Sequence, residues 1–260
     1  ALNDQVKNNP NITLITLPRS RMNSIGISTD VAPYSNPDLR AAMAYSIDRQ
    51  TLADTYFVGG AVPAYSPIAV GWGHNPDIKI YDFDLAKGKA ALAKAGFAPG
   101  SDLTMWSRGT TAALELTEIY QAMMKEVGIN VVIEQVPSAD YWQSVIKRKS
   151  HLVARWRGAR PDPGRFIHQV FHSEGQGNVM GYNSKDFGDE DVDAMIEEAG
   201  AIYDIVAAKK IYDKIQPIVT KDAAHILTVY TQEFVITNKS LQGYTFIPDL
   251  YHRFDNVWFK

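Results

Sequence analysis

Arginine and tryptophan side chains gather around a Pro-Asp-Pro turn in the stretch ARWRGARPDPGRF, residues 154–166. An arginine fork suits carboxylates and phosphates, and the flat apolar face of a tryptophan can wall a pocket. Trp156 closes the strand-like run HLVARW, and sites in open α/β sheets lie where strands end. The pattern therefore predicts a binding site for a polar, partly flat molecule, and Arg160 is the arginine we favour as its anion-binding residue.

The same stretch also has a purely structural interpretation. Arg155, Arg157 and Arg165 would then be solvated surface charges, and Asp162 would only shape a turn between two prolines. Trp156 would pack in the core. We expect this interpretation to hold for at least two of the three arginines, whereas a tryptophan at a strand end favours a pocket wall.

Motifs of enzymes and metal sites find little support in the chain. There is no GxGxxG after a strand, no GxxxxGK[ST] and no GxSxG. The absence of cysteine excludes disulfides, thiolate catalysis and thiolate zinc sites. His168 and His172 stand four apart, but Gln169 replaces the glutamate of HExxH and no third ligand is visible. We therefore expect no catalytic residue, no metal and no cofactor.

Composition limits the class of partner. The 260 residues are 45% hydrophobic and 21% charged, as in ordinary globular proteins. The net charge of −3 lacks the basic excess that nucleic-acid binding requires, so we expect no nucleic acid. No apolar run is long enough to span a bilayer, and the start, ALNDQVKNNP, lacks the features of a signal peptide. We expect either a cytosolic protein or a chain that begins in the middle of a longer one.

Residues 102–136 form the clearest structural unit. A short strand, DLTMWS, precedes an amphipathic helix and a second strand, INVVIEQV. This order predicts a right-handed crossover between two parallel strands. The helix is indicated by apolar residues that recur on one face, namely Leu116, Ile119, Tyr120, Met123 and Val127.

The rest of the chain predicts further helices and strands around this unit. We expect a capped helix over SADYWQSVIKR and a packed loop over residues 61–82. Pro18 is expected to separate two strands, and Pro217 to end a helix. The other expected elements are helices near residues 36–58, 84–96, 191–203 and 206–217, and one or two strands over HILTVYTQEFVITN.

Six segments occur in the order and spacing of one known family. They are NPDLRAAMAYSIDRQTLADTYFVGGAVPAYSPI, YDFDLAKGKAALAKAGF, EIYQAMMKEVGINVVIEQVPSADYWQSV, WRGARPDP, GYNSKDFGDEDVDAMIEEA and LQGYTF. Together they resemble family 5 extracytoplasmic solute-binding proteins, the peptide and nickel binding subunits of ABC importers. The resemblance implies an α/β fold: the C-terminal lobe of a two-lobed, type II-like periplasmic binding protein, with a mixed sheet flanked by helices.

Complete members of that family are roughly twice as long as this chain, so the resemblance covers only their C-terminal part. It implies that residues 1–34 are a remnant of the first lobe and that residues 35–222 form the second, ligand-binding lobe. Residues 223–260 would be the segment that returns to the first lobe. A chain truncated at its N-terminus would also explain the missing signal peptide.

The resemblance implies a transport role without chemistry. The two lobes of the family close on a ligand, a peptide or other small solute, and the closed form is delivered to an ABC permease in the inner membrane. The protein itself would be periplasmic and would not insert into the membrane.

Site residues carry over from the family at a few positions. Trp156 would stack on the ligand, Arg155 would lie beside it in the cleft-lining strand, and Asp162 would begin the next helix. Tyr182 matches a tyrosine near the cleft in many relatives. Where peptide binders commonly place an aspartate for the ligand's amino group, this chain has Ala159 followed by Arg160. That exchange favours an anionic ligand over an ordinary free-amino peptide.

Two other functions remain open at this stage. One is a cytosolic α/β enzyme that holds an anionic substrate at the Trp-Arg turn, which would need a nucleophile or general base beside the arginines. The other is a peptide-handling chaperone or signalling receptor on the same scaffold, which the sequence does not separate from a transport subunit.

Overall fold

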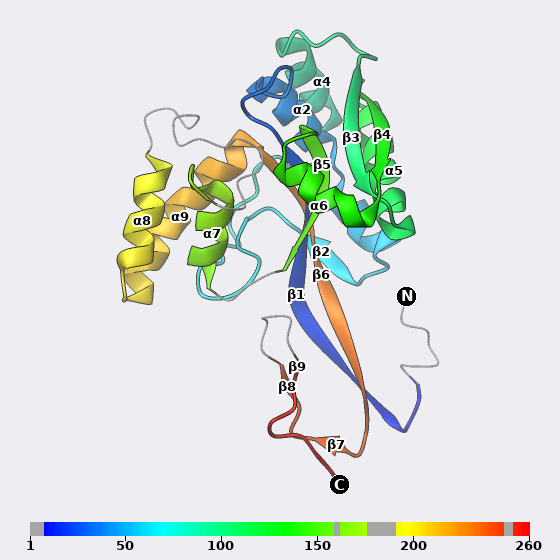
Figure 1. Cartoon of the computed structure of the whole chain (residues 1–260), viewed down its shortest axis with the longest axis vertical. Helices are drawn as coiled ribbons and strands as arrows, with labels where there is room; N and C mark the ends of the chain where they lie inside the picture. The colour runs from blue at the N-terminus through cyan, green and yellow to red at the C-terminus, as the bar shows by residue number, and fades with distance from the viewer. Residues whose placement is uncertain (1–7, 159–161, 176–190, 247–251) are drawn as a thin grey trace.

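A mixed six-stranded sheet organises the chain (Figure 1). The computed structural model describes residues 8–158, 162–175, 191–246 and 252–260. The strands follow the order β2-β6-β1-β5-β3-β4; β3 pairs in parallel with β4 and β5, and the other neighbouring strands of this sheet pair antiparallel. Their bounds are β1 Ile12–Ile27, β2 Ala61–Pro63, β3 Asp102–Arg108, β4 Asn130–Val136, β5 Leu152–Gly158 and β6 His225–Asn238. The predicted mixed α/β fold is confirmed.

Helices cover both faces of the sheet (Figure 1). The helical segments are α2 Pro37–Ser46, α3 Arg49–Thr51, the π-helical turn Leu52–Tyr56, α4 Leu85–Lys94, α5 Thr111–Lys125, α6 Ser138–Ile146, α7 Pro163–Phe171, α8 Val192–Ala201 and α9 Ile205–Asp222. On β5, Leu152 packs in the core cluster beneath α2 and α5, and Val153 packs with α6. Because successive strand residues point to opposite faces, α5 and α6 lie on opposite sides of the sheet.

The predicted crossover unit is confirmed. β3, α5 and β4 follow one another, and β3 and β4 pair in parallel from Asp102 opposite Asn130 to Arg108 opposite Val136. Leu116, Tyr120 and Met124 form the buried stripe of α5. This stripe holds the helix on the sheet, so the amino end of α5 is fixed beside the carboxyl end of β3.

Two predicted boundaries are wrong, because in each case a proline was expected to end an element that in fact continues past it. β1 continues through Pro18 because it pairs with β6 on both sides of it, with a register shift between Leu17 and Arg21 that accommodates the break. α9 continues through Pro217 to Asp222 because its buried face packs along its whole length. Tertiary packing therefore outweighs the local preference at both sites.

Two buried arginines hold segments together that lie far apart in the sequence. Arg40 of α2 forms an ion pair with Asp222 at the end of α9, with 2.6 Å between Nη2 and Oδ1. Arg49 donates from its guanidinium to backbone carbonyl oxygens, and its burial lowers the pKa of its side chain to about 10. One acceptor, Ile47, lies just before Arg49 in the sequence, and another, Leu227, lies on β6. The other two, Ala64 and Tyr81, belong to the predicted packed loop. The loop is thus ordered, as predicted.

β1 and β6 extend beyond the sheet as a two-stranded arm (Figure 1). In this arm Ile12–Leu17 pairs with residues 233–238, and short strand pairs lie near its tip. These are β7 Leu241–Gln242 with β10 Trp258–Phe259, and β8 Thr245–Phe246 with β9 His252–Arg253. The inner halves of β1 and β6 belong to the central sheet, and the division at residues 34 and 222 stays a prediction. None of the helices described here has the length and hydropathy to cross a membrane.

Candidate functional site

A cleft of about 440 Å³ lies at the carboxyl ends of β3 and β5. This volume falls in the range of small-molecule sites. The amino ends of α5 and α6 border it through Thr110 and Ser138. Its wall also carries three arginines and three aromatic residues: Arg21, Arg108, Arg155, Tyr141, Trp142 and Trp156. The described lining residues include no aspartate or glutamate.

Trp156 lies in the wall of this cleft, with 42% of its surface exposed. Its ring meets Phe57 edge-on, with 6.4 Å between the ring centroids, and it points to the α5 side of the sheet. A core position is therefore wrong for this residue. Contact with a solute stays a prediction.

Arg155 is buried, with 4% of its surface exposed, so the expectation of a solvated surface charge is wrong here. Its neighbour Val153 packs with α6, and Arg155 shares that side of β5. The guanidinium carbon lies 5.5 Å from the ring centroid of Trp142. Burial, followed by repulsion from Arg157, lowers the pKa of Arg155 well below its usual value.

Further basic groups lie on the same side of the sheet. Arg157 stacks on Phe166, 5.9 Å from its ring centroid, and burial lowers the pKa of Arg157 to about 10. His225 of β6 is buried, and its pKa is lowered well below the usual value by burial and then by Arg155 and Arg157. The described basic neighbours of Arg155 therefore do not compensate its positive charge: Arg157 repels it, and His225 is uncharged near neutral pH. Arg165 is exposed, whereas Arg155 is buried and Arg157 is largely desolvated, so the expectation that at least two of the three are solvated surface charges is wrong.

The two other arginines of the cleft differ in their partners. Arg21 forms an ion pair with Glu233 of β6, with 2.7 Å between Nε and Oε1. Arg108 is exposed at the end of β3. The sequence analysis did not single out Arg21, Arg108 or Trp142. Arg108 could have been found, because it ends a strand that runs parallel to β5, and Trp156 lies near the end of β5 itself.

Two helix amino ends face the cleft. Thr110 caps α5 and accepts a hydrogen bond from the backbone N–H of Ala113 at 3.3 Å. α6 follows Pro137 and has no side-chain cap, because Ser138 occupies the first helical position rather than the capping position. The expected cap on α6 is therefore wrong. The positive end of the helix dipole favours an anion at both places.

Asp162 is placed at the start of α7, as predicted. Its carboxylate accepts a hydrogen bond from the backbone N–H of Gly164 at 3.1 Å, and Pro163 occupies the first turn. Asp162 is not among the residues that line the cleft. Arg160, Ala159 and Tyr182 lie outside the described residues, so their roles stay predictions.

His168 and His172 stack on each other, with ring centroids 4.5 Å apart. His172 Nε2 lies 3.4 Å from Glu197 Oε1. Within the described ranges, no three metal-ligating side chains come together. The pair has a structural explanation in the packing of α7 against α8.

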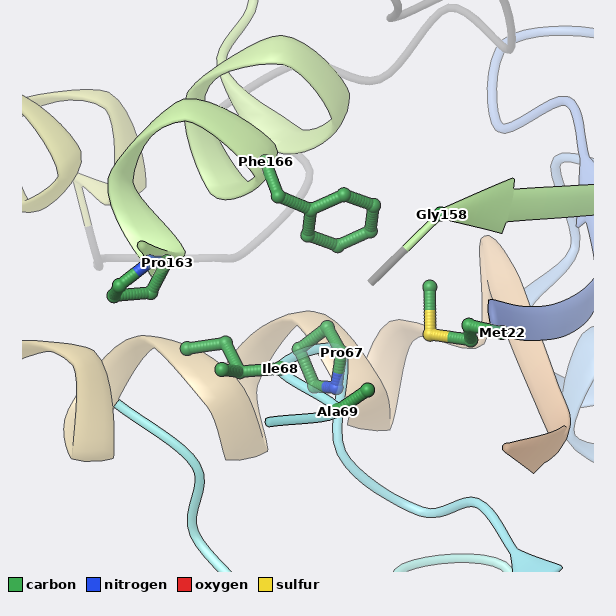
Figure 2. Close-up of a pocket in the computed structure, with 7 residues that line it drawn as sticks. All are labelled: Met22, Pro67, Ile68, Ala69, Gly158, Pro163 and Phe166. Atoms are coloured by element: carbon green, nitrogen blue, oxygen red, sulfur yellow. The ribbon is translucent and has the colours of Figure 1, made fainter. Parts of the chain in front are cut away.

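A second, much smaller cavity of about 10 Å³ lies between α7 and the loop after β2 (Figure 2). Figure 2 shows Phe166 and Pro163 of α7 on one side and Pro67 and Ile68 of the loop on the other. The cavity is apolar and has room for about one water molecule. It is therefore no site for a solute.

Comparison with known proteins gives consistent results. Residues 2–178 match the family model described as bacterial extracellular solute-binding proteins, family 5 Middle. Heme-binding protein A of Haemophilus influenzae is 24% identical over 97% of this chain and 47% of its own length. The dipeptide-binding protein of Escherichia coli is 24% identical over 97% of this chain and 48% of its own length. The chain thus spans about half the length of these relatives.

Comparison of the fold with solved structures gives a consistent result. The solved structure of HbpA2 from Haemophilus parasuis superposes on 99% of this chain and 52% of its own, with a TM-score of 0.85 and 25% sequence identity.

Proposed function

Because the chain belongs to the bacterial extracellular solute-binding proteins of family 5, we propose that it forms one wall of the solute-binding cleft of an ABC importer's binding subunit. It holds a peptide or another small, anionic solute in the cleft between β3, β5 and the starts of α5 and α6. In the whole protein this wall closes on the solute together with a further lobe, and the closed form is delivered to a permease in the inner membrane.

The composition of the cleft supports an anionic solute. Three arginines line it, of which Arg21 is paired with Glu233, and the described lining residues themselves contribute no carboxylate. The chain as a whole is slightly acidic, so this local excess of positive charge is not a property of the entire surface. Positive charge inside a cleft with apolar walls attracts and orients anions. The solute is therefore expected to carry at least one carboxylate or other oxyanion.

The aromatic residues suit a peptide-like or flat solute. Trp142 and Trp156 are both about half exposed in the cleft wall and come from opposite sides of β5. Such rings supply large apolar contact area while losing little conformational freedom. One relative is named for dipeptide binding and another for heme binding, and both solutes carry carboxylates beside apolar groups.

Binding rather than catalysis fits the polar groups of the cleft. Its described lining offers the hydroxyls of Thr110, Ser138 and Tyr141 but no histidine and no carboxylate that could act as a general base. The family relatives are binding proteins as well. An enzyme acting on an anionic substrate would need a base within hydrogen-bonding reach of its nucleophile.

Native mass spectrometry of the complete protein, purified from its own periplasm, tests the proposal. We expect a bound mass that corresponds to an acidic small solute or a peptide. A bound cationic solute without any carboxylate would contradict it. Reproducible turnover by the complete protein on a panel of phosphate and carboxylate substrates would favour the enzyme instead.

A further inference from the structure

Arg155 carries a buried positive charge that no described side chain neutralises. All three of its guanidinium nitrogens are buried, and none has a hydrogen-bond partner in the part of the chain that the structure describes. The contact described for the guanidinium is the ring face of Trp142, 5.5 Å away. The charged neighbour that acts on it is Arg157, which repels it.

Such an arrangement is costly. A buried cation without a partner is unfavourable by several kcal/mol, and buried polar groups in native proteins are almost always hydrogen-bonded. A ring face compensates only a small part of this, about 2 kcal/mol when the pair is desolvated. The position therefore calls for an anion.

Two other arginines of the chain show the usual solution. Arg40 and Arg49 are each 3% exposed, as buried as Arg155. Arg40 pairs with the carboxylate of Asp222 and donates to the carbonyl oxygen of Tyr34. Arg49 donates to four carbonyl oxygens. Arg155 differs from both of them, and it is also the one of the three that lines the cleft.

The surroundings of Arg155 give an anion access and further support. Trp142, which lies over the guanidinium, lines the same cleft and is 45% exposed, so Arg155 is covered by a side chain of the cleft wall rather than by the core. The uncapped amino end of α6 adds backbone N–H groups and a positive dipole beside it.

We propose that Arg155 is the residue that receives the carboxylate of the bound solute in a two-point contact, with Trp142 moving aside to admit it. A carboxylate fits because its two oxygens match the planar fork of a guanidinium. The inference rests on the proposed function, and it assigns the anion-binding role to a residue other than Arg160. It also requires that the solute end in a free carboxylate that can reach past Trp142.

Calorimetry on the complete protein with two matched tripeptides, a free C-terminal acid and the corresponding amide, tests this assignment. We expect the wild type to bind the acid about 10- to 100-fold more tightly than the amide. Arg155→Met should abolish this preference, and Arg155→Lys should restore part of it. Arg165→Met, at an exposed arginine outside the cleft, should keep it in full.

Thermal unfolding without any peptide provides a second readout. Because methionine removes the uncompensated charge, Arg155→Met is expected to leave the midpoint unchanged or to raise it. A large fall would show that an acidic group of the complete protein already neutralises Arg155, which would overturn the inference.

Two further outcomes distinguish a wrong role for Arg155 from a wrong function of the chain. If the wild type binds both peptides equally and Arg155→Met changes neither affinity, the role of Arg155 is wrong and the solute-binding function stands. If the wild type binds neither these peptides nor any member of a panel of small carboxylates, the proposed function fails and the inference fails with it.

Discussion

At the scale of the residue, His225 is expected to make stability depend on pH. Its burial and the two nearby arginines hold its folded pKa well below the unfolded value of about 6.5. The unfolded chain therefore binds a proton that the folded chain does not. The stability is complete above about pH 6.5 and is lost as the pH falls towards the folded pKa, by at most about 1.4 kcal/mol per pH unit.

Denaturant unfolding of His225→Gln between pH 5 and pH 8 checks this expectation. The variant should show a shallower loss of unfolding free energy in acid than the wild type. His252→Gln, at an exposed histidine near the tip of the arm, serves as the control and should keep the wild-type slope. Equal slopes for the wild type and His225→Gln would contradict the assignment.

Trp156 permits a prediction about affinity that is separate from stability. Trp156→Ala should weaken binding of the co-purified solute about 10-fold, because a half-exposed ring in a cleft contributes about 1 kcal/mol or slightly more through its contact face. The unfolding free energy should change little. Trp258→Ala, on the exposed strand pair near the arm's tip, should leave the affinity unchanged when both are measured by calorimetry.

The sequence predicted Trp156 better than Arg155, and the reason is physical. A tryptophan near the end of a strand lies on one face of the sheet or the other, and the alternation of side chains along β5 decides which face. The burial of Arg155 depends instead on α6 folding back across β5 and on Trp142 stacking over the guanidinium. These contacts lie between segments, and no local pattern reveals them.

At the scale of the element, the ion pair between Arg40 and Asp222 joins α2 to the end of α9. Both side chains are nearly inaccessible, so Asp222→Ala leaves a buried guanidinium without its charged partner. We expect a loss of about 3–5 kcal/mol of unfolding free energy. Lys94→Ala breaks the exposed pair with Asp38 and should cost about 1 kcal/mol or less. Similar losses in urea denaturation would contradict this ranking.

Most helices and strands could be predicted from periodicity and caps. Asn36 and Asp84 cap α2 and α4, as their positions before apolar repeats suggest. The boundaries predicted at Pro18 and Pro217 are wrong. Pairing of β1 with β6 outweighs the local cost of Pro18, and the buried face of α9 outweighs that of Pro217. That compensation comes from residues far away in the sequence.

At the scale of the whole molecule, the arm is expected to promote association between chains. Its strands pair with each other, and in the described part of the chain no third strand covers residues 12–17 or 233–238. Phe234 and Ile236 are exposed there. Because open strand edges pair readily, sedimentation should show concentration-dependent association. Ile236→Lys should reduce it, and a strictly monomeric wild type at high concentration would contradict the idea.

The fold class and the family could be predicted from the sequence because their signals are spread over the whole chain. Six segments in the right order carried the resemblance, and the family match over residues 2–178 agrees with it. The division into lobes and the identity of the solute are not carried by such a distributed signal. They stay predictions.

The central position of β1 also sets the order of events during synthesis. β1 lies between β5 and β6, so the register of Met22 opposite Tyr230 closes a loop of about 200 residues, which takes the ribosome about 10–40 s to produce. Until the last strand emerges, β1 has one open edge and the sheet is incomplete. Such long-range pairing slows folding, so the complete sheet is expected to form only after most of the chain has been translated.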